Sequence, residues 1–309
     1  MIMTRGFVTI ATGNPFYYEL ARNLLLSYKL YTDKPYPFAI LCDQENEYTA
    51  LFDDVVLIPN AKKNYFDKFE LLIRAPYDET IFIDADCLAY DDLNRYWDYF
   101  QNADDFSAGG EDVPADSDGG LFWVDSIGEY KDRVHWKPSI HGGLYFIRRG
   151  PVCDAIYRDY QNIMAHYSEY RWPDDCVDEP VFGLAMAANG CHSMEEYPDN
   201  YVYPWLTTWL SCDIFTGKCT YRTIDGDFVE QGKLIHWSVR YCRKPLYRFE
   251  SEKTQVLTER GLRPGGVFSA MTLKERIWYQ WKLRYGFLLA EDFCRRAWKK
   301  LFRILKISQ

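Results

Sequence analysis

The sequence lacks long apolar runs, a net positive charge and any regular spacing of its cysteines. No window reaches the roughly 18 apolar residues of a membrane-spanning helix. The formal net charge of -9 argues against a general nucleic-acid binder, which needs a basic surface. The nine cysteines are odd in number and form no C-x-x-C pair. Neither a disulfide framework nor a structural zinc site is therefore expected.

The N-terminus lacks the charged segment and long apolar stretch of a secretory signal, because the apolar run from Phe7 to Ala11 is too short. With the unpaired cysteines, this predicts a reducing, cytoplasmic location. What the chain does have is aromatic residues, at 17% with 25 tyrosines and 10 tryptophans. Flat rings with a polar group suit sugar stacking or an interface, although a tyrosine-rich core also explains much of the excess.

Apolar runs of strand length alternate with helical patterns over about the first ninety residues. This alternation is typical of a parallel sheet with helices on its faces, and so of an α/β fold. The predicted strands are Gly6–Ala11, Phe38–Cys42, Val55–Pro59 and Ile81–Ile83, and the predicted helices are 17–31 and 66–75.

Asp84 and Asp86 directly follow the buried strand Ile81–Ile83. Ligands of open α/β sheets bind at the carboxyl ends of the strands. Two adjacent carboxylates repel each other unless a cation offsets their charge, and a hard divalent ion with oxygen ligands does so. The alternative is an exposed acidic loop. A second such pair, Asp225 and Asp227, flanks a glycine and is read as a turn.

The second half of the chain predicts further elements of the same kind. The polar, acidic and glycine-rich segment 102–118 is expected to be a mobile surface loop. Segment 197–210 is expected to be irregular. The predicted strands are 144–147, 221–224 and 234–238, and the predicted helices are 152–167 and 181–188.

An acidic group precedes the helix predicted over 181–188 and contains Asp174, Asp175, Asp178 and Glu179. Acids are favoured near a helix N-terminus by the helix dipole, which explains the group without any function. A catalytic role for these carboxylates carries equal weight.

The tail, residues 272–306, holds ten lysines and arginines against three acids, with tryptophan and phenylalanine among them. Thr272–Glu275 matches a capping box that begins a helix. A basic, aromatic-rich amphipathic helix is typical of a protein that lies on an anionic membrane surface. The alternative is an ordinary helix that packs on the domain.

These features together resemble a GT-A glycosyltransferase, a Rossmann-like nucleotide-diphospho-sugar transferase fold. They are most similar to glycosyltransferase family 8, the group of glycogenin-like and lipopolysaccharide galactosyltransferase-like enzymes. The resemblance implies a mixed, mostly parallel central sheet with helices on both faces. It implies a glycosyltransferase domain over residues 1–250, followed by a helical, basic and aromatic tail over 251–309.

The resemblance also implies roles for individual residues. A uridine-nucleotide loop is matched by Ala11, Thr12, Asn14 and Tyr17, and the metal motif by Asp84, Ala85 and Asp86. The start of a strand that contacts the donor sugar is matched by His141, Gly142 and Gly143. The remaining matches are Lys68 near the donor, the pair Asp178 and Glu179 beside the reacting sugar carbon, His236 as a third metal ligand and Lys244 near a phosphate.

Three positions depart from the family pattern. His141 stands where the family usually has asparagine, and Glu179 where it usually has glutamine. Lys244 lies two residues further from His236 than the family spacing. These departures concern the donor sugar and the stereochemistry more than the fold.

The expected chemistry is the release of a diphosphate from a nucleotide sugar. A Mn²⁺ or Mg²⁺ ion held by Asp84, Asp86 and His236 would neutralise the charge that develops on the leaving phosphate. Glu179, with Asp178 beside it and Asp175 behind, would act as a base or stabilise an oxocarbenium-like centre. The sequence leaves inverting and retaining outcomes open.

The sequence therefore predicts a metal-dependent transferase that moves a sugar from a nucleotide-diphosphate sugar, such as a UDP-hexose, onto a glycan or lipid-linked glycan. It would act at the cytoplasmic face of a membrane, held there by residues 272–306. One alternative is a nucleotidyltransferase acting on sugar phosphates, which Gly13 alone supports poorly because such enzymes use a glycine-rich, basic loop. Another is a non-catalytic module that binds nucleotide sugars.

Overall fold

The computed structural model describes residues 3–172, 178–194, 201–229 and 232–304. The chain divides into two compact units. Unit 1 comprises Met1–Leu25, Lys34–Cys87 and Leu93–Tyr201, and unit 2 comprises Leu26–Asp33, Leu88–Asp92 and Val202–Gln309. The predicted boundary at residue 250 stays a prediction.

Unit 1 is built on a six-stranded mixed sheet in the order β3-β2-β1-β4-β7-β6. The four strands β3, β2, β1 and β4 are parallel, and β7 and β6 add antiparallel neighbours. The α/β class and the mixed, mostly parallel sheet are thereby confirmed. The strands are β1 (Arg5–Ala11), β2 (Phe38–Cys42), β3 (Asp54–Leu57), β4 (Glu79–Ile83), β6 (Phe106–Pro114) and β7 (Trp136–Arg148).

Helices cover both faces of this sheet, as predicted. One face contributes Val8, Phe82 and Tyr145 to a buried cluster that also contains Leu72, Ile156 and Phe182 from three helices. On the other face the Trp97 ring lies 5.7 Å from the Phe7 ring. The helices with residues in unit 1 are α1 (Pro15–Tyr31), which continues into unit 2, α2 (Leu71–Arg74), α3 (Tyr96–Tyr99), α4 (Pro151–Ala165) and α5 (Glu179–Ala188).

Strand β6 corrects one prediction. Segment 102–118 was expected to be a mobile loop, yet Phe106–Gly110 is a buried part of the sheet. The segment has few β-branched residues, so its sequence gives no strand pattern. Its glycines instead permit close pairing with β7, because a Cβ at Gly110 would lie 2.2 Å from the Ser139 carbonyl oxygen.

Unit 2 contains the three-stranded sheet β11-β10-β9 and, except for Cys87 and Tyr201, the three-stranded sheet β5-β12-β8. Segment 197–210, expected to be irregular, contributes β8 and the start of β9, and residues 195–200 lie outside the described part of the chain. The strands are β5 (Cys87–Ala89), β8 (Tyr201–Val202), β9 (Thr207–Asp213), β10 (Lys218–Thr223), β11 (Phe228–Val229) and β12 (Leu234–His236). The helices are α6 (Ser238–Cys242), α7 (Pro245–Glu259), α8 (Val267–Ala270), α9 (Leu273–Glu275) and α10 (Leu283–Ile304).

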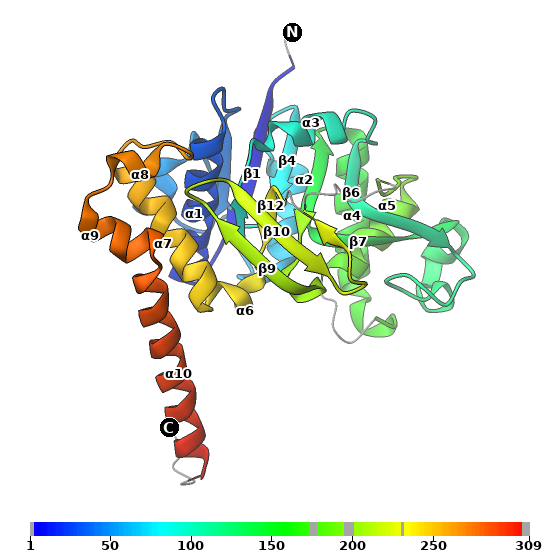
Figure 1. Cartoon of the computed structure of the whole chain (residues 1–309). Helices are drawn as coiled ribbons and strands as arrows, with labels where there is room; N and C mark the ends of the chain where they lie inside the picture. Colours follow the sequence, from blue (N-terminus) through cyan, green and yellow to red (C-terminus); the bar gives the residue numbers. More distant parts are fainter. Residues whose placement is uncertain (1–2, 173–177, 195–200, 230–231, 305–309) are drawn as a thin grey trace. The chain divides into compact units, whose positions relative to one another are not determined.

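The tail begins with the predicted capping box, in which the Thr272 hydroxyl and the Glu275 side chain cap each other's backbone N–H groups. It does not continue as one helix. A π-helical turn spans Arg276–Gln280, and Lys282 has a φ of 58°, a left-handed conformation that ends the helix. This break lets Tyr279 pack on Phe249 before α10 (red in Figure 1) begins.

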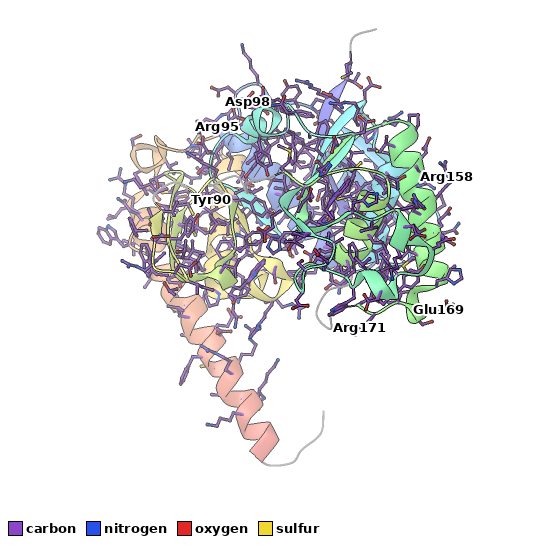
Figure 2. The ribbon with its side chains drawn as sticks, turned by 90° about the vertical axis from the view of Figure 1, so that its right-hand side faces the viewer. Tyr90, Arg95, Asp98, Arg158, Glu169 and Arg171 are labelled. Atoms are coloured by element: carbon purple, nitrogen blue, oxygen red, sulfur yellow. The ribbon has the colours of Figure 1, made fainter. Side chains whose placement is uncertain are left out.

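The core of unit 2 holds a buried ion cluster. The Lys253 ammonium lies 2.7 Å from Glu250 Oε1 and 2.5 Å from Asp213 Oδ1. The other Glu250 oxygen accepts hydrogen bonds from the Ile214 N–H and from the hydroxyl of Tyr90, which Figure 2 labels. Every member of this cluster therefore has partners within unit 2.

Within the described residues, eight cysteines are free thiols, and only Cys294 among them is exposed. None of the described helices combines the length and apolarity needed to cross a bilayer.

Candidate active site

Lys68 is the centre of the candidate site in unit 1. Its ammonium lies 3.0 Å from Asp84 Oδ2 and 3.0 Å from Asp178 Oδ2, and it donates a 2.9 Å hydrogen bond to the Gly142 carbonyl. These groups come from four segments far apart in the sequence. The fold thus brings together residues of the predicted metal motif, donor-sugar strand and acidic pair.

The local structure explains why Lys68 is fixed. Asn64 begins a short 3₁₀ helix over Tyr65–Glu70 by accepting the Phe66 N–H. Phe69 then enters the core, where its ring stacks between Tyr160 and Phe182 at centroid distances of 3.8 and 3.7 Å. Because its neighbour is anchored this way, the Lys68 side chain has little freedom to leave the carboxylates.

Asp84 is placed by the sheet itself. The five residues of β4 are buried, and Asp84 follows the last of them. Its backbone N–H donates to the Gly143 carbonyl, and its carbonyl accepts the Cys87 N–H, so the chain turns tightly there. Ala85 and Asp86 lie in this turn and are buried. The predicted acidic strand end is therefore confirmed as a structure, while its metal role stays a prediction.

Glu179 is the first residue of α5, so the helix begins two residues earlier than the predicted range 181–188. Its Oε1 accepts a 2.7 Å hydrogen bond from the Gly142 N–H and lies 3.9 Å from His141 Nδ1. The Glu179 side chain keeps 25% of its surface exposed and that of His141 keeps 40%. Both residues are therefore accessible to a ligand.

Side chains of the site pack closely around the Gly142 backbone. A Cβ on it would lie 3.2 Å from Asp178 Oδ2, 3.2 Å from the Tyr145 hydroxyl and 3.3 Å from Glu179 Cγ. A side chain there would crowd all three groups. The close approach of these groups to the backbone thus explains why this position of β7 is a glycine.

The electrostatics of the site favour charged forms. Burial alone would lower the pKa of Lys68, but Asp178 and Asp84 raise it well above its ordinary value. Burial alone would raise the pKa of Glu179, but His141 and the Gly142 N–H lower it below its ordinary value. Burial raises the pKa of the Tyr145 phenol, with the Asp178 charge adding to the effect. Near neutral pH the site thus contains an ammonium, ionised Glu179 and a neutral phenol.

The predicted nucleotide loop follows β1 and is held by two acids. The Thr12 hydroxyl donates to Asp67 Oδ2 at 2.7 Å, and the Gly13 N–H donates to Asp43 Oδ1 at 3.0 Å. Asp43 also accepts the Tyr18 hydroxyl, and Lys63 Nζ lies 3.1 Å from its Oδ2. Burial alone would raise the pKa of Asp43, but Tyr18, Gly13 and Lys63 lower it. The loop is therefore rigid and ends beside an ionised carboxylate.

The other predicted residues of this loop are also placed. Ala11 ends β1 and is buried, and the Asn14 side chain accepts the Phe16 N–H as α1 begins. Tyr17 is half-buried in the first turn of that helix. Asn14 thus has a structural role in capping α1, and a donor contact remains a prediction.

Two predicted residues belong to unit 2. His236 ends β12, and its ring lies 5.6 Å from that of Tyr203 and 5.5 Å from that of Trp205. Lys244 is exposed at the start of α7. Their contribution to a site with Asp84 and Asp86 stays a prediction. Asp175 lies outside the described residues.

Sequence reasoning missed three residues of the site. Asp43 carried a signal, because it directly follows the strand Phe38–Cys42 just as Asp84 follows β4. Asp67 and Tyr145 carried none. Asp67 lies in a helical segment, and only the tertiary structure turns it toward Thr12. Tyr145 lies in an apolar strand, and only the tertiary structure brings its hydroxyl close to Gly142.

No protein-family model matches the chain, and no curated protein matches its sequence. Among solved structures, the chain is similar to the galactosyltransferase LgtC in complex with donor and acceptor sugar analogs. The TM-score is 0.52 at 13% identity, and the match covers 82% of this chain and 95% of that one. This likeness shows the fold, which is that of a GT-A glycosyltransferase.

Two further structures match less well. The bifunctional glycosyltransferase WbbM has a TM-score of 0.41 at 12% identity and covers 66% of this chain and 40% of its own. The glycosyltransferase GlyE of Streptococcus pneumoniae has a TM-score of 0.43 at 11% identity and covers 64% of this chain and 46% of its own.

Proposed function

We propose that this protein is a metal-dependent glycosyltransferase that uses a nucleotide-diphosphate sugar, a UDP-hexose in the first instance. The acceptor is a glycan or a lipid-linked glycan. The observation that carries the proposal is the contact of one buried ammonium, Lys68, with Asp84, Asp178 and the Gly142 carbonyl. It supports the roles that the resemblance implied for these segments, on a fold shared with a galactosyltransferase.

The charges of unit 1 fit a divalent cation. Asp84, Asp178 and Glu179 lie around a single lysine, and Asp86 is two residues from Asp84. The carboxylates outnumber the ammonium, and their oxygens are the donors that Mn²⁺ and Mg²⁺ prefer. Asp84 and Asp86 would hold the ion, and the family resemblance implies His236 as a further ligand. When bound, the ion supplies electrostatic stabilisation of the departing diphosphate.

The chain's own residues would do the rest. Lys68 keeps Asp84 and Asp178 in fixed positions and adds positive charge near the donor. Glu179 is ionised and held by the Gly142 N–H, so it suits a general base or a group that stabilises positive charge on the sugar ring. Thr12 and Gly13, fixed by Asp67 and Asp43, would orient the nucleotide. Lys244 would add positive charge near a phosphate.

The direct test measures sugar release and UDP formation with Asp86→Ala. We expect the metal-dependent rate to fall by about 100-fold or more. The matched control is Asp225→Ala, which removes an acid of the same sequence pattern from an exposed turn and should leave the rate unchanged. Undiminished, metal-independent turnover in Asp86→Ala would reject the proposal.

A calorimetric titration of UDP and GDP, with and without Mn²⁺, separates the alternatives. Metal-dependent UDP binding with sugar release supports a transferase. Binding without release supports a non-catalytic module. Pyrophosphate formation from a nucleoside triphosphate and a sugar phosphate would instead identify a nucleotidyltransferase.

We also propose that the tail holds the enzyme on the cytoplasmic face of an anionic membrane. Along α10, the exposed apolar side chains Phe287, Phe293 and Trp298 share the helix with an array of cations. Leu288 is fully buried, so one side of α10 packs while much of its apolar surface remains uncovered. An amphipathic helix of this kind binds anionic lipid through apolar insertion and charge attraction. The cations are Arg295, Arg296, Lys299 and Lys300.

Co-sedimentation with vesicles tests the tail. We expect the full chain to sediment with phosphatidylglycerol vesicles and less with neutral phosphatidylcholine. Phe287→Ser with Trp298→Ser should reduce binding, whereas Leu51→Ser, an exposed apolar residue of unit 1, should not. Equal sedimentation of wild type and double variant would refute the membrane role.

A further inference from the structure

An aromatic platform occupies one face of the sheet β9-β10-β11 in unit 2, and it consists of Trp209, Arg222 and Phe228. Arg222 is paired with Trp209 on β9 and with Phe228 on β11, so the three side chains lie in one row across the sheet. The Trp209 and Phe228 rings have centroids 6.0 Å apart and planes inclined by 25°. They form a continuous aromatic surface.

The platform is not needed for the core of unit 2. Residues of the same strands alternate between the two faces, and Leu210, Cys212, Cys219 and Tyr221 lie on the opposite one. On that face Cys212, Cys219 and Tyr221 are buried, whereas Trp209 is 48% exposed and Phe228 is 51% exposed. Large exposed aromatics that add nothing to a core mark a binding surface.

The backbone holds this surface in place. The pairing of β9 with β10 shifts between Arg222 and Thr223, because Thr208 is an extra residue that forms a β-bulge. The Arg222 guanidinium donates to the Gly226 carbonyl at 3.2 Å, and the Asp227 N–H donates to the Thr223 hydroxyl at 3.0 Å. The row is thus preorganised, which lowers the entropy cost of binding.

We propose that this platform binds a neutral glycan chain, the acceptor of the proposed transferase, and the inference rests on that proposed function. The negative faces of the rings attract the polarised C–H groups of a sugar, and Arg222 supplies hydrogen-bond donors beside them. The two ring centroids lie 6.0 Å apart, so each ring can stack on one of two successive sugars. The row therefore suits a chain rather than a monosaccharide.

The charges around the platform select a neutral partner. Arg222 and Lys218 are balanced by Asp225 and Asp227, and all four side chains are exposed. An anionic membrane would be repelled by the two acids of the turn, which distinguishes this face from the cationic helix α10. A neutral glycan meets no such repulsion.

The test measures binding of linear neutral oligosaccharides, malto- and cello-oligosaccharides of two to six hexoses, to the full chain by calorimetry. We expect Kd to fall with chain length. Trp209→Ala and Phe228→Ala should each raise Kd by roughly threefold to tenfold, the value of one aromatic contact. The matched control is Ile224→Ala, which removes an exposed apolar side chain of the same hairpin outside the row and should leave Kd unchanged. Thermal midpoints confirm that each variant is folded.

Three outcomes would overturn the platform. Wild-type protein that binds none of the oligosaccharides, or binding that survives both aromatic substitutions, rejects it. If both aromatic variants instead lose vesicle binding or become smaller by sedimentation, the face belongs to a membrane or to a second copy of this chain. Donor hydrolysis by the wild type without oligosaccharide is measured separately. Hydrolysis without glycan binding refutes the platform alone, and glycan binding without hydrolysis refutes the transferase alone.

Discussion

Each unit of the molecule buries a lysine between two carboxylates, yet the two clusters differ in what their carboxylates still offer. In unit 2, Lys253 meets Glu250, whose side chain is 1% exposed and whose oxygens also accept Ile214 and Tyr90. In unit 1, Lys68 meets Asp84, whose side chain is 20% exposed and follows the end of a parallel strand. The Glu250 end of the first cluster is therefore closed, although Asp213 on the other side of Lys253 keeps 34% of its side chain exposed. The second cluster is distinguished by its place at the end of a parallel strand.

Residue types alone do not separate a structural ion cluster from a functional one. A buried ion pair is weak support for stability, because desolvation offsets much of the attraction. What distinguishes Lys68 is its position at the carboxyl edge of the sheet, with Glu179 and His141 accessible beside it. We therefore expect changes in the Lys253 cluster to affect folding and changes in the Lys68 cluster to affect the response to ligands as well.

The largest effect is expected for Glu250→Ala. It leaves the Lys253 ammonium with one carboxylate and removes the acceptor of the Ile214 N–H. Removing one member of a buried ion cluster should lower the free energy of unfolding by about 3–5 kcal/mol. Urea denaturation measures this loss. The control is Glu252→Ala, which lies on the same helix as Glu250. It breaks a partly exposed ion pair with Arg284 of α10 and should cost under about 1 kcal/mol of the free energy of unfolding. Similar losses of unfolding free energy in the two variants would contradict a closed environment around Glu250.

The next effect sharpens the contrast between the lysines. Lys68→Met and Lys253→Met should both lower the thermal midpoint, because each leaves buried carboxylates without their cation. Mn²⁺ should raise the thermal midpoint of Lys68→Met, because the ion replaces the missing positive charge. At a Mn²⁺ concentration of 100 times the Kd for the ion, binding adds about 2.7 kcal/mol to the free energy of unfolding. Lys253→Met keeps the proposed site of unit 1, so Mn²⁺ should raise its midpoint only as much as that of the wild type. An equal response to Mn²⁺ in both variants would remove the proposed difference.

A smaller effect is expected for Gly142→Ala. The new methyl group would crowd Asp178, Tyr145 and Glu179, and overpacking of this kind costs about 1–3 kcal/mol. Sugar release should fall with it because the carboxylates shift. Gly286→Ala, with open space around its Cβ, serves as the control and should be neutral or slightly stabilising in α10. A fully active, stable Gly142→Ala enzyme would contradict the close packing around Gly142.

The smallest effect concerns pH. The folded-state pKa of Glu179 is lowered, so its contribution to stability is present above the unfolded pKa and is lost as pH falls through the folded pKa. Wild type should therefore lose more unfolding free energy than Glu179→Gln between pH 6 and about pH 3. Since one hydrogen-bonded group contributes about 1 kcal/mol, the difference is modest. Parallel stability curves would show that Glu179 is not held in its ionised form.

Much of the fold was predictable from periodicity. The strands Phe38–Cys42 and Ile81–Ile83 were apolar runs of strand length, and their positions are confirmed. Strand β6 was not predictable, because Ser107–Gly110 has no apolar alternation. Its glycine at position 110 instead allows the backbones of β6 and β7 to approach closely. The tail was predicted as one amphipathic helix, but it breaks at Lys282, just after Tyr279 packs against Phe249.

The sequence by itself determined which strands end in carboxylates and that Asp178 and Glu179 begin a helix, because these are properties of neighbouring residues. Only the tertiary structure decided that Lys68 meets Asp84 and Asp178, that Asp43 and Asp67 hold the loop after β1, and that Trp209 and Phe228 share a face. Such contacts join residues many positions apart. Their geometry depends on register and packing, and local sequence patterns encode neither.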